Sequence, residues 1–411
     1  MIAYTLSFSE AHAHMLDVRL DIPNPPDNLE LWMPVWTPGS YLVREYSRHV
    51  SDLEITGATG DALPWTQTAK NRWAVQARGE GRVQVRYRVY GRELSVRTNW
   101  IESGFCLLNG AATFLVVRGA EAKPVGVRLQ LPDSWAGVWT GLPRDAQNTV
   151  DGETNRVTAF TAPDLDTLID CPIGAGSPAV HDFSVDGVPF HLVNFEEGGL
   201  WDGAKAARDV AKIVETYRAM YGGLPFERYW FLNYIVEGRG GLEHKNSCVM
   251  MTSRYTFRRR KAYVDWLGLA SHEFFHVWNV KRSRARTLGP FDYERETYTR
   301  ALWVAEGITA YYTDLMPCRA GVSTPEEFLA EFSGLIKTLE STPGRHAQSL
   351  ETSSFNAWIK LYRPDENTAN STVSYYLKGA IVSWLLDAEI RRASGGKRTL
   401  DDVMRRLFED F

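Results

Sequence analysis

Residues 272–282 read HEFFHVWNVKR and lie in a helical pattern that spans 262–282. His272 and His276 are four residues apart, so they face the same side of a helix, one turn from each other. This spacing suits two imidazole nitrogens at about 2.0–2.1 Å from one Zn²⁺. Glu273, next to the first histidine, can reach water beside such a metal and act as a general base. A catalytic zinc site still needs a third protein ligand and one open position.

The segment 302–311, LWVAEGITAY, predicts a second amphipathic helix with one carboxylate among apolar residues. A buried carboxylate is costly unless it is paired or binds a metal, so Glu306 is the natural third ligand. The 29 residues 277–305 separate it from His276, which is enough for a loop and a returning helix. The alternative, that the two histidines simply pack in a core, does not account for Glu306.

The strand pattern YWFLNYIV at 229–236 is followed by GGLEH at 240–244. Glycines allow an edge strand to approach a substrate closely. The carboxylate of Glu243 could hold a positively charged group of a substrate. His244 could be a fourth metal ligand, but we favour a polar strand residue that lines the cleft.

The first 180 residues have a β-like pattern. Residues 83–90, VQVRYRVY, alternate apolar and polar side chains with the period of a half-buried strand. Asp186 and Gly187 predict a tight hairpin within 183–190. Many short strands separated by proline and glycine predict a sandwich-like domain. The other predicted strands lie at 2–8, 14–20, 29–35, 113–117, 125–131 and 155–161.

From about residue 200 the pattern is mostly helical. We therefore expect an α+β protein, with an N-terminal all-β domain at 1–178 and a mostly helical domain with a small sheet at 179–411. The predicted helices lie at 202–221, 262–282, 298–316, 325–341, 372–392 and 399–411.

The composition is that of a globular protein. Of 411 residues, 44% are hydrophobic and 23% charged, which excludes a disordered chain. The net charge of −4 argues against a nucleic acid or an anionic membrane as partner. Four widely spaced cysteines favour a reducing compartment. Since the N-terminus does not read as a secretory signal and no run of 18 apolar residues occurs, we expect a cytoplasmic protein without a membrane anchor.

Several stretches together resemble the glycyl aminopeptidase family, number sixty-one in the peptidase classification, whose members are zinc peptidases of the gluzincin group. The matches keep their order over nearly the whole chain, and the first of them resembles the family's N-terminal β domain. More distantly, the site resembles aminopeptidase N and leukotriene-A hydrolase. The stretches are WMPVWTPGSYLVREYSRHV (32–50), GGLEHKNS (240–247), HEFFHVWNVKR (272–282), ALWVAEGITAYY (301–312) and YRPDENTANSTVSYYLKGA (362–380).

The resemblance implies a thermolysin-like catalytic domain and a zinc-dependent aminopeptidase. Such an enzyme would remove small N-terminal residues, glycine or alanine, from peptides with a free N-terminus. One Zn²⁺ per chain would be bound by His272, His276 and Glu306. Glu273 would deprotonate the water that the metal activates and pass the proton to the leaving amine.

The resemblance also implies the groups that bind the substrate. Tyr376 would donate its hydroxyl to the oxyanion, and its neighbour Tyr375 is the rival for that role. Glu243 would bind the free α-amino group. The remaining predicted substrate-binding residues are Gly240, Gly241 and His244.

The sequence departs from these families in specific places. His244 stands where aminopeptidase N has asparagine, and the spacer before Glu306 is longer, which weakens the transfer of substrate details. The chain stops at Phe411, before the helices and the PDZ domain that family members usually carry, so we expect a shortened C-terminus. Two alternatives stay open: a zinc hydrolase of another specificity, such as an endopeptidase, and an inactive peptide-binding scaffold that keeps its metal site.

Overall fold

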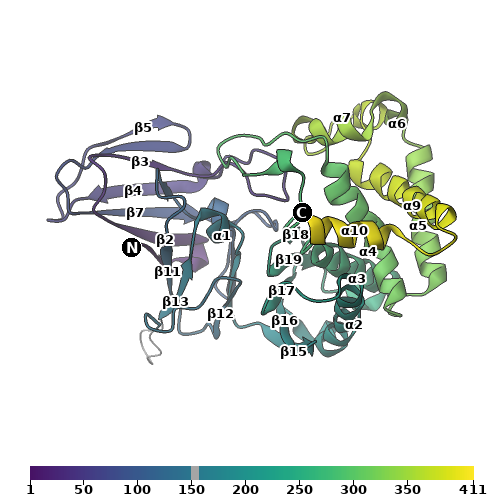
Figure 1. Cartoon of the computed structure of the whole chain (residues 1–411). Helices are drawn as coiled ribbons and strands as arrows, with labels where there is room; N and C mark the ends of the chain where they lie inside the picture. The colour runs from purple at the N-terminus through teal and green to yellow at the C-terminus, as the bar shows by residue number, and fades with distance from the viewer. Residues whose placement is uncertain (150–156) are drawn as a thin grey trace. The chain divides into compact units, whose positions relative to one another are not determined.

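The structure, a computed structural model, describes residues 1–149 and 157–411 and divides into two compact units (Figure 1). Unit 1 consists of Met1–Ala179 with Tyr293–Arg295, and unit 2 of Val180–Asp292 with Glu296–Phe411. Unit 1 is built mainly of sheets and unit 2 mainly of helices, so the predicted fold class is confirmed. In the part of the chain that the structure describes, no helix is both long and apolar enough to cross a bilayer.

The described residues of unit 1 form three sheets, of which the largest has the strand order β13-β11-β1-β2-β7-β4. The predicted strand at 83–90 is confirmed as part of β7, where the valines at 83 and 85 are buried and the intervening side chains face outward. The other two sheets have the orders β10-β3-β6-β5 and β12-β14-β9-β8. The strands are β1 (Ile2–Ser7), β2 (Met15–Pro23), β3 (Asn28–Trp32), β4 (Val50–Thr56), β5 (Trp65–Ala69), β6 (Arg72–Gln76), β7 (Arg82–Tyr90), β8 (Trp100–Ile101), β9 (Phe105–Leu108), β10 (Val116–Val117), β11 (Val125–Gln130), β12 (Gly137–Thr140), β13 (Val157–Ala162) and β14 (Ile173–Gly176), and they are joined by one short helix, α1 (Leu165–Ile169).

One predicted strand of unit 1, at 113–117, is largely wrong. Only Val116–Val117 pair as a strand, after a 3-10 turn at Gly110–Ala112. The side chain of Asn109 caps that turn by accepting a hydrogen bond from the backbone N–H of Ala111 at 3.2 Å, and this local bond competes with strand formation. The first two positions of the strand predicted at 155–161 lie outside the described residues.

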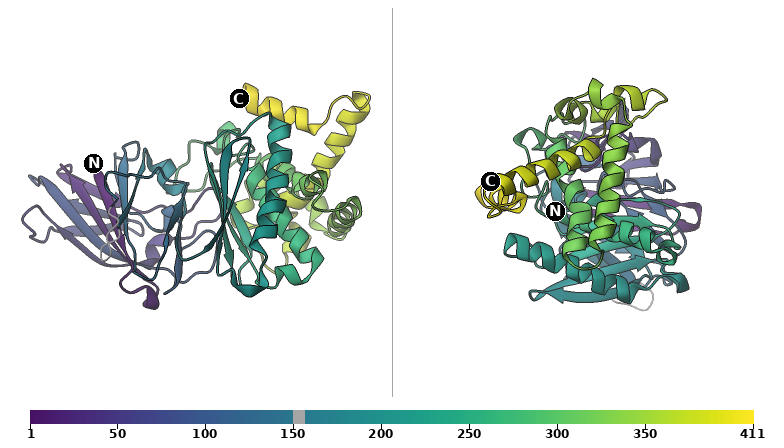
Figure 2. Two further views of the ribbon diagram at one scale, coloured as in Figure 1. Left: turned by 90° about the horizontal axis from the view of Figure 1, so that it is seen from below. Right: turned by 90° about the vertical axis from the view of Figure 1, so that its right-hand side faces the viewer.

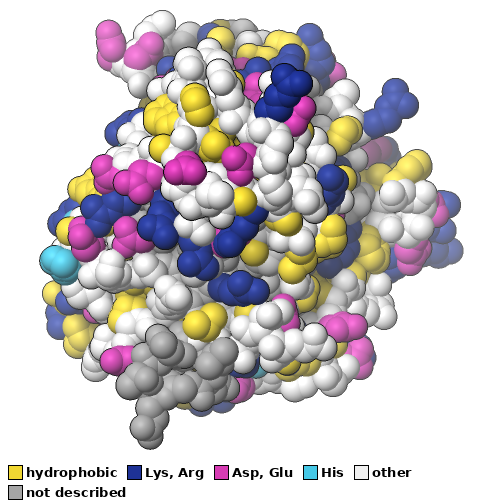
Figure 3. Space-filling model, turned by 90° about the vertical axis from the view of Figure 1, so that its left-hand side faces the viewer, with side chains coloured by type: hydrophobic (Ala, Val, Ile, Leu, Met, Phe, Trp, Pro, Cys, Tyr) yellow, Lys and Arg dark blue, Asp and Glu magenta, His cyan; other side chains and the backbone are white. Residues whose placement is uncertain are grey.

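Charged side chains of both signs are intermingled on the face drawn in Figure 3. Ion pairs of this kind join neighbouring strands of the large sheet, as between Arg88 on β7 and Asp17 on β2 at 3.0 Å. Pairs on an exposed sheet face contribute little to the free energy of unfolding, at most about 1 kcal/mol each.

The sheet of unit 2 has the strand order β15-β16-β17-β19-β18. The predicted hairpin is confirmed, because Asp186 and Gly187 both have positive φ angles, 54° and 77°, between β15 and β16. Strand β18 pairs antiparallel with β19 at the edge of the sheet, and helices α2 and α3 pack on the sheet (Figures 1 and 2). The strands are β15 (Ala179–Val185), β16 (Val188–Phe195), β17 (Tyr229–Ile235), β18 (Gly240–Glu243) and β19 (Ser247–Thr252).

The predicted helices of unit 2 form, with two differences near the histidines, and three short α-helices between 344 and 371 were not predicted. Helix α3 ends at Phe275 rather than at 282. The backbone N–H of Val277 bonds only three residues back, to the carbonyl of Phe274 at 3.1 Å, and the φ of 104° at Val280 excludes an α-helix there. The helix predicted at 298–316 begins instead with a π-helical turn, η7 (Trp303–Gly307), before α4. The α-helices are α2 (Gly203–Tyr221), α3 (Arg260–Phe275), α4 (Ile308–Arg319), α5 (Pro325–Glu340), α6 (Gly344–Ala347), α7 (Leu350–Phe355), α8 (Thr368–Ser371), α9 (Tyr375–Ala393) and α10 (Leu400–Asp410).

Candidate active site

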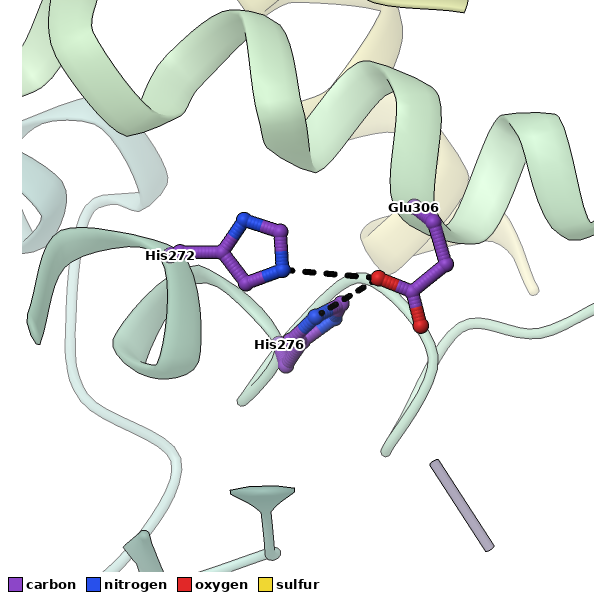
Figure 4. A group of neighbouring side chains, drawn as sticks. All are labelled: His272, His276 and Glu306. Atoms are coloured by element: carbon purple, nitrogen blue, oxygen red, sulfur yellow. Dashed lines mark ion pairs between the residues drawn. The ribbon is translucent and has the colours of Figure 1, made fainter. Parts of the chain in front are cut away.

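Three side chains converge where the end of α3 meets η7 (Figure 4). The Oε2 atom of Glu306 lies 3.4 Å from Nε2 of His272 and 3.2 Å from Nε2 of His276. The side chains of His276 and Glu306 are 1% and 2% exposed, so water hardly screens them. His276 caps α3 in a helical conformation, and for that reason it stays on the same face as His272 although the helix ends there.

The far nitrogen of each imidazole is held by a hydrogen bond. Nδ1 of His272 pairs with Oγ1 of Thr313 at 2.8 Å, and Nδ1 of His276 pairs with the backbone carbonyl of Asn279 at 2.9 Å. Partners of this kind fix the tautomer and the ring orientation of histidines that bind metals. Both Nε2 atoms are therefore presented to Glu306.

The electrostatics of the cluster favour a positive charge at its centre. Burial opposes ionisation of Glu306, but the two imidazoles outweigh it and lower the pKa of that carboxyl to about 2. Burial also opposes protonation of His276, yet Glu306 and Glu243 raise the pKa of His276 to about 10. The pKa of His272 is lowered, mainly by burial. The cluster thus favours a positive charge beside the Glu306 carboxylate.

The donor atoms of this cluster fit a zinc ion. The ligand atoms of His272, His276 and Glu306 lie within 4.8 Å of one another. Two imidazoles and one carboxylate are a ligand set of catalytic zinc, and the ion would take the place of the positive charge that the site already favours.

Asn279 connects the end of α3 with the turn that carries Glu306. Its side-chain amide donates to the backbone carbonyls of Val304 and Ala305 at 2.9 and 3.0 Å, and contacts Oγ1 of Thr309 at 3.0 Å. A π-helical turn shifts the backbone hydrogen bonds of its carbonyls, and turns of this kind are frequent at functional sites. Because its carbonyl also accepts from His276, Asn279 couples the second histidine to the third ligand.

The carboxyl of Glu273 lies against the backbone of strand β18. A Cβ built on Gly241 would stand 2.0 Å from Oε1 of Glu273, so only glycine fits there. The preceding Gly240 has a φ of 119°, which also favours glycine. Glu243 follows on the same strand. One carboxylate oxygen of Glu243, one of Glu273 and a ring nitrogen of His276 all lie within 4.8 Å of one another.

Tyr376 lies at the start of α9 and faces the first histidine. Its ring centroid is 6.3 Å from that of His272. Tyr375 stacks on Tyr376 at 4.6 Å and is itself 0% exposed, so Tyr376 is the tyrosine that is better placed to meet a substrate. The N-terminus of α9 is capped by Ser374, whose Oγ accepts from the backbone N–H of Leu377 at 3.3 Å.

The structure brings most of the predicted residues together and adds one. His244 is buried at the end of β18, and the groups of possible ligands found among the described residues do not include it. Thr313 is the residue that sequence reasoning missed. It stands seven residues after Glu306, two helical turns along the same face, and that spacing is the signal that could have identified it.

Comparisons with known proteins identify the family of the chain. The family described as Peptidase M61 N-terminal domain matches residues 3–177, and the family described as M61 glycyl aminopeptidase matches residues 265–382. A solved structure described as an aminopeptidase N family protein from Idiomarina loihiensis is 35% identical, with a TM-score of 0.94 over 100% of this chain and 70% of its own. No curated protein sequence matches the chain.

A more distant solved structure is an M1 zinc metallopeptidase from Deinococcus radiodurans. It is 16% identical, with a TM-score of 0.59 over 100% of this chain and 86% of its own, and this likeness shows the fold. Together with this fold, the match to the M61 family model defines the class of zinc metallopeptidases. Within that class, the chain belongs to the M61 glycyl aminopeptidase family.

Proposed function

We propose that this protein is an aminopeptidase that removes glycine or alanine from the N-terminus of peptides and binds one zinc ion per chain. The observation that carries the proposal is the buried cluster of His272, His276 and Glu306, with Glu273 on the same helix. A cytoplasmic location, which the four widely spaced cysteines favour, is part of the same proposal.

His272, His276 and Glu306 would hold the Zn²⁺, which supplies Lewis acidity when bound and lowers the pKa of water to about 7. Glu273 accepts a proton from the attacking water while the new C–O bond forms at the scissile carbonyl. It then gives the proton to the leaving nitrogen while the C–N bond breaks. The hydroxyl of Tyr376 donates to the carbonyl oxygen as negative charge develops there, a contribution that is typically worth about 10²–10³ in rate.

Glu243 selects peptides with a free N-terminus. Glu243 is 4% exposed and lies beside Glu273 at the edge strand, so its carboxylate can pair with an α-ammonium group away from water. The preference for glycine is supported by the description of the matching family, M61 glycyl aminopeptidase.

The free N-terminus can be tested with Glu243→Gln, which removes the charge and keeps the shape. We expect kcat/KM for Gly- and Ala-p-nitroanilide to fall at least about 30-fold, because a buried charge pair is lost. The rate with N-acetylated peptides should change less than twofold. Glu237→Gln is a matched control, since the Glu237 side chain is 71% exposed. If Glu243→Gln lowered the rates of free and acetylated substrates equally, the assignment of Glu243 and of an aminopeptidase would be wrong.

A further inference from the structure

The hydroxyl of Tyr376 lies close to a second tyrosine hydroxyl, which comes from a different segment. The Oη of Tyr362 is 3.4 Å from the Oη of Tyr376. Tyr362 lies between the 3-10 turn η8 (Ala357–Ile359) and helix α8, fourteen residues before Tyr376. Each phenol hydroxyl can donate one hydrogen bond and accept others. One hydroxyl can therefore donate to the other, whose own hydrogen is then available for a third group.

Local structure holds Tyr362 in this place. Its backbone N–H donates to the carbonyl of Ala357 at 3.1 Å, and η8 is anchored by Trp358, which is 2% exposed. After Tyr362, the backbone N–H of Asp365 donates to Oγ1 of Thr368 at 2.7 Å, at the start of α8. The segment is therefore fixed on both sides of the tyrosine.

The helix that carries Tyr376 is fixed as firmly. The backbone N–H of Val373 donates to the side-chain oxygen of Gln348 at 3.0 Å, and the ammonium of Lys378 donates to the backbone carbonyls of Arg345 and Gln348, both at 3.1 Å. Because both tyrosines stand on anchored backbone, the fold keeps their two segments side by side.

We propose that Tyr362 is a positioning residue that donates its hydroxyl hydrogen to the Tyr376 oxygen, so that the Tyr376 hydrogen points at the substrate carbonyl. The proposal rests on the proposed function, since it assigns Tyr376 to the oxyanion. A hydroxyl that accepts one hydrogen bond becomes a stronger donor of the next, because the chain of bonds is polarised. The distance of 3.4 Å is long for O–H···O, and hydrogen bonds in active sites commonly shorten in the transition-state complex.

The size of the effect follows from the type of bond. A hydrogen bond between two neutral hydroxyls changes an equilibrium or a rate by about 3- to 10-fold. Tyr362→Phe should therefore lower kcat for Gly-p-nitroanilide by about 3- to 10-fold and leave KM within about twofold. Tyr376→Phe should lower kcat by about 10²–10³.

The test is a double-mutant cycle of Tyr362→Phe and Tyr376→Phe, measured by kcat and by calorimetric binding of a phosphinic pseudodipeptide that imitates the oxyanion. If the proposal is right, Tyr362→Phe weakens turnover and phosphinate binding about 3- to 10-fold when Tyr376 is intact, and has less than a twofold effect on either in the Tyr376→Phe background. Zinc content stays the same in all variants. Tyr298→Phe is the matched control, because Tyr298 stacks on Phe355 and is 44% exposed. It should change neither quantity.

Four results would overturn the proposal. An equal effect of Tyr362→Phe in both backgrounds would mean a purely structural role, and no effect in either would mean that the two hydroxyls are not coupled. If Tyr376→Phe were as active as the wild type, or the wild type did not cleave the substrate, the proposed function itself would fail, and the assignment of Tyr362 with it.

Discussion

Alanine at position 379 is expected to shift the third predicted ligand, Glu306, relative to Tyr376, the tyrosine that we propose for the oxyanion. Gly379 on α9 lies against Gly307, the last residue of η7, so closely that a Cβ built on Gly379 would stand 2.7 Å from the Gly307 Cα. The reciprocal Cβ on Gly307 would stand 2.6 Å from the Gly379 Cα and 2.9 Å from the backbone carbonyl of Tyr375. Carbon atoms pack at about 3.5–4.0 Å, so one backbone would have to move by about 0.8 Å or more.

This movement reaches the site through two short connections. Glu306 directly precedes Gly307, and Tyr376 stands one helical turn before Gly379. A misplacement of about 1 Å can cost about 100-fold in rate, so we expect Gly379→Ala to lower kcat by about 10- to 100-fold. Zinc should remain bound, because both histidines belong to the end of α3 and keep their own hydrogen bonds. Overpacking should reduce the free energy of unfolding by about 1–3 kcal/mol.

The assay combines steady-state kinetics on Gly-p-nitroanilide, metal analysis and thermal unfolding. Gly334→Ala on α5 is the matched control, because no atom stands within 4 Å of a Cβ at that position. It should leave kcat unchanged and stabilise the protein by about 0.5–1 kcal/mol, as alanine does in a helix. A Gly379→Ala protein with the kcat and stability of the wild type would refute the role of this crossing.

Three further changes probe the surroundings of the site. Gly241→Ala would place a Cβ 2.0 Å from Oε1 of Glu273. We expect kcat to fall about 100-fold or more while the zinc content stays the same. Loss of zinc instead would show that the carboxyl of Glu273 is wrongly placed. Thr313→Val removes the hydrogen bond to Nδ1 of His272. Competition with a chelator should then show a zinc affinity that is about 10- to 100-fold lower. An unchanged affinity would contradict the role of Thr313 in holding His272. Asp387→Asn removes a carboxylate. Burial raises the pKa of Asp387, but hydrogen bonds and an arginine outweigh burial and lower it. Urea unfolding at about pH 7 should therefore show a free energy of unfolding that is about 1–3 kcal/mol smaller in the variant. A carboxyl whose pKa is lowered by folding stabilises the folded state at pH values above its unfolded pKa of about 3.9. The difference between wild type and variant should therefore disappear as the pH falls through the folded-state pKa. A constant difference at every pH would exclude the ionised carboxylate as its cause.

Much of the fold can be predicted from local patterns. The alternation at 83–90 and the Asp186-Gly187 turn are local signals, and the corresponding strand and hairpin form as expected. The end of α3 could not be predicted in this way. Apolar residues continue to Val280 in the sequence, but the φ of 104° at Val280 is incompatible with an α-helix. The preceding Asn279 donates to the carbonyls of Val304 and Ala305, which are distant in the sequence.

The candidate site divides in the same way. The histidines and Glu306 were found because their residue types and spacing are unusual on apolar helices, and the structure brings the three together, although their roles stay a prediction. The groups that support them depend on tertiary packing. The hydrogen-bond partner of His272 is Thr313, whereas its neighbour Asp314, equally polar in the sequence, points its Oδ1 toward Gly268. The π-helical turn around Glu306 had no recognisable signal in the sequence either.

The central claim is that His272, His276 and Glu306 bind a zinc ion beside a general base. Its most direct test is to measure metal content and hydrolysis of Gly- and Ala-p-nitroanilide on the same preparation, for the wild type and for Glu273→Gln. We predict about one zinc per chain in both proteins, with hydrolysis by the wild type and at least about 100-fold slower hydrolysis by the variant. A wild-type protein that binds no zinc even after reconstitution, or a Glu273→Gln variant that keeps its activity, would contradict the account.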